Sequence, residues 1–122
     1  MTIQGLKYIN NLFKKIISYQ FVTYASDEVI YPYWIGEYSE VGSLNEDGLQ
    51  ETSFILTGTT RGQWLELEKD KKKIKESLRD ATAILEDGTG IALFYENAII
   101  IPVDDIELKR MQINITIKEW EV

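Results

Sequence analysis

The sequence contains no cysteine and no histidine, and only two prolines among its 122 residues. Without cysteine there are no disulfide bonds and no thiolate zinc sites, and this composition suits a reducing compartment. Without histidine the chain lacks the usual general base and the commonest metal ligand. These absences are the strongest sequence evidence against catalysis, so we predict no enzymatic activity, no cofactor and no bound metal.

Long hydrophobic runs are absent as well. No apolar run approaches the roughly 18 residues that a membrane helix needs, and Lys7, Lys14 and Lys15 interrupt the N-terminal region, unlike a signal peptide. We therefore expect a cytoplasmic protein without a membrane partner. Basic residues are also few, with 13 against 20 acidic residues and a net charge of −7. An acidic surface repels phosphate groups, which disfavours sequence-independent binding of nucleic acid.

The remaining sequence predicts one α+β domain over residues 1–122, a length typical of a single domain. Apolar spacing predicts a helix over residues 3–18, with Thr2 as a candidate N-cap. A capping box at Thr60 and Gln63 starts a second helix that runs to Leu78. Alternating or β-branched segments predict strands at residues 29–39, 50–60, 91–95, 98–103 and 111–118. The expected order is α-β-β-α-β-β-β, a single, mainly antiparallel sheet with both helices on its apolar face. The other face stays polar or is covered by a partner.

Several segments begin like known binding or catalytic motifs, but their spacing or their context does not match those motifs. Gly88-Thr89-Gly90 begins like a dinucleotide-binding loop, but a strand follows where a helix is needed. The segment 58–62 precedes a helix without the Lys-Ser/Thr pair of a phosphate-binding loop. Two carboxylate clusters could serve an acid–base or metal-dependent enzyme only if they converged, and solvated turns are the favoured interpretation. These clusters are Glu46 with Asp47, and Asp104 with Asp105 and Glu107.

Aromatic residues crowd the first predicted strand. Alternation places Tyr31 and Tyr33 on one face and Trp34 and Tyr38 on the other, while Pro32 favours an edge position or a strand that starts after the proline. Tyrosine and tryptophan anchor protein interfaces, although the same residues could pack under the helices or a loop. We predict an interface formed by these four aromatic residues together with Glu40, Glu46, Asp47 and Trp120.

Three segments suggest a family. They are Tyr31–Glu37 (YPYWIGE), Thr52–Gly58 (TSFILTG) followed by Arg61, Gly62 and Trp64, and the closing Ile113–Ile117 (INITI). Together they resemble the small tail-completion or tail-terminator proteins of long-tailed bacteriophages and prophages. The resemblance implies a ring, commonly a hexamer, that binds tail-tube and head-connector proteins, with DNA at most passing through it. It also implies assembly in the bacterial cytoplasm, a final place in the virion tail, and no active-site residues.

An alternative remains open from composition alone. A small, cysteine-free domain with a charge of −7 also fits an acidic immunity or inhibitor protein that neutralises a basic partner. Such a protein would form a tight, salt-sensitive complex with a basic toxin or nuclease.

Overall fold

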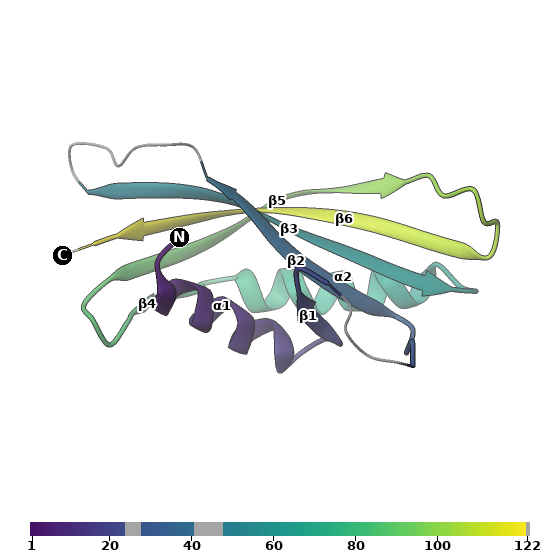
Figure 1. Cartoon of the computed structure of the whole chain (residues 1–122), viewed down its shortest axis with the longest axis horizontal. Coiled ribbons are helices and arrows are strands. Elements are labelled where there is room, and N and C mark those ends of the chain that lie inside the picture. Colours follow the sequence, from purple (N-terminus) through teal and green to yellow (C-terminus); the bar gives the residue numbers. More distant parts are fainter. Residues whose placement is uncertain (24–27, 41–47, 122) are drawn as a thin grey trace.

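The computed structural model describes residues 1–23, 28–40 and 48–121 (Figure 1). Within these residues the elements follow the order α-β-β-β-α-β-β-β, so the predicted α+β class is confirmed. The elements are α1 (Ile3–Lys14), β1 (Tyr19–Phe21), β2 (Tyr33–Glu40), β3 (Leu49–Arg61), α2 (Leu65–Leu78), β4 (Thr82–Ile84), β5 (Gly90–Ile101) and β6 (Leu108–Trp120).

The predicted strand order is incomplete and in one place wrong. β1 and β4, which were not predicted, have only three residues each, too few to show an alternating pattern. Residues 91–95 and 98–103, predicted as two strands joined by a turn, belong mostly to the single strand β5. The register of β5 against β6 shifts between Tyr95 and Asn97, so Glu96 is the extra residue of a β-bulge. Polar residues suit a bulge as well as a turn, and the sequence pattern does not separate the two.

The helix starts agree with the sequence in one case and differ in the other. The Thr2 hydroxyl caps α1 by accepting a hydrogen bond of 2.9 Å from a backbone N–H of the first turn. α2 starts after Trp64, which makes no side-chain capping bond. The predicted capping box of Thr60 and Gln63 is therefore wrong. Thr60 lies in β3, and its hydroxyl donates a hydrogen bond of 2.8 Å to Glu66.

The strands form one sheet in the order β1-β2-β3-β6-β5-β4. Adjacent strands run antiparallel except for β1 and β2, which are parallel. β3 and β6 occupy the centre and pair along their whole length. Both helices lie on the same side of the sheet (Figure 1), and no described helix covers the opposite face.

The hydrophobic core fills the space between the sheet and the two helices. In β6, Met111, Ile113, Ile115 and Ile117 are buried and alternate with less buried polar residues, which is the predicted pattern. Each such fully buried side chain contributes about 1.5–3 kcal/mol. The helices and the neighbouring strands contribute the other large side chains of the core, among them Ile9, Phe13, Leu67, Ile74, Phe54, Leu56 and Trp34.

Candidate interaction surfaces

Trp34 of β2 lies in the core. Its side chain is fully buried, and its indole N–H donates a hydrogen bond of 2.9 Å to the carboxylate of Asp70 in α2. The indole also lies over Gly58 of β3, where an added Cβ would come within 2.6 Å of the ring. The prediction that Trp34 anchors a partner protein is therefore wrong, because the side chain has no accessible surface. Trp34 instead ties α2 to the sheet.

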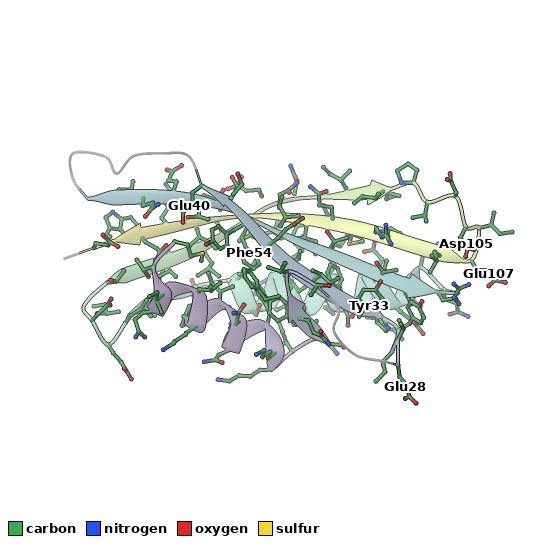
Figure 2. All side chains as sticks on the ribbon, viewed as in Figure 1. Glu28, Tyr33, Glu40, Phe54, Asp105 and Glu107 are labelled. Carbon is green, nitrogen blue, oxygen red and sulfur yellow. The ribbon has the colours of Figure 1, made fainter. Side chains whose placement is uncertain are left out.

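Tyr31 and Tyr33 lie at the start of β2, partly exposed, with ring centroids 5.7 Å apart. The guanidinium of Arg61, at the end of β3, lies 5.9 Å from the centroid of the Tyr31 ring. It also forms ion pairs with Glu107 (2.8 Å) and Asp105 (3.5 Å). Hydrogen bonds with Tyr31 and Glu107 raise the pKa of Arg61 above its ordinary value. Tyr33, Asp105 and Glu107 lie toward the same end of the molecule (Figure 2).

This arrangement accounts for two members of the second carboxylate cluster. Asp105 and Glu107 form ion pairs with Arg61 at the molecular surface. Among the residues that the structure describes, no group of three or more acidic residues is placed to hold a metal ion. Glu46 and Asp47, predicted as interface residues and as possible partners of this cluster, lie outside the described residues.

Tyr38 and Glu40 lie in the second half of β2, toward the other end of the strand from Tyr33. Tyr38 is partly exposed, and its ring stacks on Phe21 at a centroid distance of 6.1 Å. The Glu40 carboxylate forms an ion pair with the N-terminal amino group of Met1 and accepts a hydrogen bond of 3.0 Å from Gln50. Tyr38 therefore keeps an exposed part of its side chain, whereas the Glu40 carboxylate is already bonded within the chain.

Trp120, at the end of β6, is 39% exposed and belongs to the helix-free face. The preceding residue, Glu119, points the opposite way and is fully buried. Its carboxylate accepts hydrogen bonds from the backbone N–H of Thr2 (3.1 and 3.2 Å) and from the Thr2 hydroxyl (2.6 Å). A carboxylate at the start of a helix also complements the helix dipole. No local sequence pattern predicts this contact, which joins the end of β6 to the start of α1.

The helix-free face of the sheet is mixed in character. Cross-strand registers place apolar and polar side chains in alternating positions across its centre, where Ile55 lies beside Asn114 and Ile99 beside Gln112. The apolar members of this face include Ile35, Ile55, Ile99, Ile101, Phe94 and Trp120. The face is thus neither purely polar nor a continuous apolar patch.

Charge is distributed unevenly between the helices and the rest of the chain. Residues 3–15 and 65–79, which cover both helices, contain nine basic and four acidic residues, a formal charge of +5. The rest of the chain then carries −12, since the total is −7. Lys14, Lys15 and Lys73 line a hollow between the end of α1 and α2 together with Asp70, and Lys69 and Lys72 line the adjoining one together with Glu66 and Glu76. The two helices, which form the helix side of the sheet, are therefore net basic in an otherwise acidic protein.

No helix in the described part of the chain is long and apolar enough to cross a membrane. The sequence matches no protein-family model and none of the curated proteins.

Proposed function

We propose that this chain is a structural protein of a long-tailed phage or prophage, acting as a tail terminator or head–tail completion protein. It assembles into a ring, commonly a hexamer in the family that the sequence resembles, and binds tail-tube and head-connector proteins. The residues that carry the resemblance support this proposal, because segments 31–37, 52–58 and 113–117 come together on the neighbouring strands β2, β3 and β6. A functional unit that recurs across a family is expected to be contiguous in space.

The uneven charge is the observation that favours a ring. A basic helix side and an acidic remainder attract each other when copies meet head to tail, because different surfaces of the two copies then come into contact. Contacts between different surfaces generate rings when the rotation closes, whereas a surface that meets itself generates a pair. The formal charge of −12 on the rest of the chain also suits a channel through which DNA passes without adhering.

The proposed role needs neither catalysis nor a cofactor. It also needs no anchor from Trp34, since the half-buried Tyr31 and Tyr33 and the exposed Tyr38 and Trp120 remain as aromatic contacts. The protein would be made in the bacterial cytoplasm and would end in the virion tail.

Electron microscopy with charge-reversal variants tests the proposal. Lys72→Glu with Lys73→Glu reverses charge on the helix side, while Lys109→Glu with Lys118→Glu makes the same change in β6 and serves as the matched control. We expect rings, or binding to purified tail tubes, for the native chain and the control pair, and a loss of both for the helix-side pair. A native chain that forms no rings and binds no tubes at any concentration would overturn the proposal.

The acidic remainder also favours the second candidate, an immunity or inhibitor protein for a basic toxin or nuclease. Here a tight complex would weaken as salt rises, because screening reduces the attraction between opposite charges. Reversal of Lys72 and Lys73 would leave such a complex intact or strengthen it. The same two variants therefore separate the two functions.

A further inference from the structure

The second half of β5 is an open edge of the sheet. β4 pairs only with the first three residues of β5, from Gly90 to Ala92, and the N–H of Leu93 bonds to the carbonyl of Ala81. Beyond Leu93, none of the described strands pairs with β5 on the side away from β6. The open half nevertheless carries large apolar side chains, with Phe94 45%, Ile99 49% and Ile100 68% exposed. An exposed, apolar strand edge is a template for pairing with another strand.

Two features limit the part of this edge that can pair regularly. The bulge at Glu96 interrupts the ladder on one side, and Pro102, which has no N–H to donate, follows the last residue of β5 on the other. Between them lies the regular segment Asn97–Ile101, with Ile99 at its centre. The register against β6 places Asn97, Ile99 and Ile101 on the helix-free face and Ala98 and Ile100 on the helix face.

We propose that two copies of this chain pair antiparallel through Asn97–Ile101, around a two-fold axis at Ile99. In this arrangement Ile99 meets Ile99 of the second copy, Ala98 meets Ile100, and Asn97 meets Ile101. Each pair joins residues of the same face, as an antiparallel ladder requires. The contact covers the exposed isoleucines and extends the sheet across both copies.

Charge favours a second β5 as the occupant over the other open edge. The unpaired half of β2 is only four residues long and contains Glu37 and Glu40. Pairing β5 with it would bring those carboxylates toward Glu96, and like charges across a ladder are destabilising. A β5–β5 contact contains no charged residue between the bulge and Pro102. The second copy of the chain is therefore the partner that fits.

This contact goes beyond the ring. A ring needs a head-to-tail contact between different surfaces, whereas an edge that meets its own copy forms a closed pair. The pair covers the apolar edge in the free protein, before any contact with other assembly proteins. The inference stands whether or not the chain belongs to a phage tail.

Single-cysteine variants test the two-fold contact cleanly, because the native chain has no cysteine. Opposite residues in an antiparallel ladder have Cα atoms about 4.5–5.5 Å apart, within the range that a disulfide spans. We expect Ile99→Cys alone to give a disulfide-linked dimer under mild oxidation. Ile106→Cys, in the exposed turn after β5, is the control and should give no disulfide-linked dimer at the same concentration. Equal cross-linking of both variants, or none at Ile99, would overturn the proposal.

Sedimentation of the full chain supplies the second measurement. Ile99→Lys places two like charges on the two-fold axis, so we expect the dimer to dissociate at least about tenfold more readily, a change of about 1.4 kcal/mol. The matched Ile106→Lys variant should sediment like the native chain. Because Ile99 is half exposed, both variants should retain the native circular dichroism spectrum. A native chain that sediments as a monomer at all accessible concentrations would rule out the pairing.

The experiments on the two-fold contact can succeed or fail independently of ring formation. Cross-linking at Ile99 without any ring or tail-tube binding would retain the pair and reject the phage function. Rings with a monomeric free protein and no Ile99 cross-link would retain the function and reject the pair.

Discussion

The two long outer strands, β2 and β5, begin alike and end differently. Each is paired near its start with a strand of three residues, β1 beside β2 and β4 beside β5. The open half of β2 is mainly polar, with Glu37, Ser39 and Glu40 exposed alongside Tyr38. The open half of β5 is apolar, with Phe94, Ile99 and Ile100 exposed. Proteins commonly protect an edge with charge, so β2 has the features of a protected edge and β5 those of a contact surface.

β2 and β5 also differ on the helix face of the sheet. β2 is fixed to the core by Trp34, which bonds to Asp70 and lies over Gly58. On β5, the Lys75 ammonium lies 4.9 Å from the centroid of the Tyr95 ring, and Phe94 faces away from the helices. β2, whose aromatic residues were predicted to form an interface, thus contributes to the core. β5, which was predicted as two strands, provides the open apolar edge.

Removal of the Trp34 side chain is expected to have the largest effect. Trp34→Ala should lower the free energy of unfolding by about 3–5 kcal/mol, because it leaves a cavity and an unpaired buried carboxylate on Asp70. Phe94→Ala on β5 should cost less than about 1 kcal/mol, because that side chain is half exposed. Urea denaturation measures both. Equal losses for the two variants would remove the contrast between the strands.

Trp34→Phe separates packing from hydrogen bonding at the same position. It keeps an aromatic ring in the core but removes the indole N–H, so we expect a smaller loss of about 1–3 kcal/mol. A Trp34→Ala protein that stays as stable as the native one but loses self-association would restore the prediction of a surface anchor.

Two glycines provide the next test of the contrast. An added Cβ at Gly58 would meet the buried Trp34 ring at 2.6 Å, so Gly58→Ala should cost about 1–3 kcal/mol of stability. At Gly90 of β5 the nearest atom would lie 3.7 Å away, an ordinary contact with Trp120. Gly90→Ala should therefore be neutral or stabilise the fold by less than about 1 kcal/mol. Thermal unfolding of both variants measures the difference, and a more harmful change at Gly90 would contradict it.

The sequence predicted the elements whose signal is local. β6 was clear because Met111 and the three isoleucines after it alternate with polar residues over a long strand, and β2 begins after Pro32 as one of the expected options. The Thr2 cap of α1 was also predicted. Three-residue strands carry too little pattern to be recognised, and a polar bulge resembles a turn.

The contacts that define the candidate surfaces are long-range and could not be predicted from spacing. Alternation grouped Trp34 with Tyr38 correctly, but a strand with large residues on both faces does not reveal which face is inside. Asp70 is 36 residues from Trp34, and Glu119 is 117 residues from Thr2. The open edge of β5 depends on the strand order of the sheet, which no single segment specifies.

The contact between Thr2 and Glu119 should have an intermediate effect. It fixes the start of α1, the helix that contacts β1 on the β2 side of the sheet. Thr2→Ala removes both the helix cap and the 2.6 Å bond to Glu119, so we expect a loss of about 1–2 kcal/mol. Thr2→Ser keeps the hydroxyl and is the control. If both variants unfold at the same urea concentration as the native chain, the contact contributes nothing to stability.

The smallest expected effect concerns Tyr19 of β1, the strand that covers the first half of β2. Burial raises the pKa of Tyr19 above its ordinary value of 10.0, and its hydroxyl donates a hydrogen bond of 2.6 Å to Asn10. A raised pKa means that the contribution of Tyr19 to stability is complete below about pH 10 and declines as the pH rises further.

Urea denaturation at about pH 8 and pH 11 measures this decline. At pH 11, about one pH unit above the ordinary pKa of tyrosine, the unfolded chain has released the Tyr19 proton whereas the folded chain retains it. The free energy of unfolding of the native protein should therefore fall by up to about 1.4 kcal/mol more than that of Tyr19→Phe over this interval. Other tyrosines titrate in both proteins, and the difference between them therefore reports Tyr19 alone. An equal loss in the two proteins would mean that β1 does not bury this hydroxyl, and that the edge of β2 is as open at its start as that of β5 is at its end.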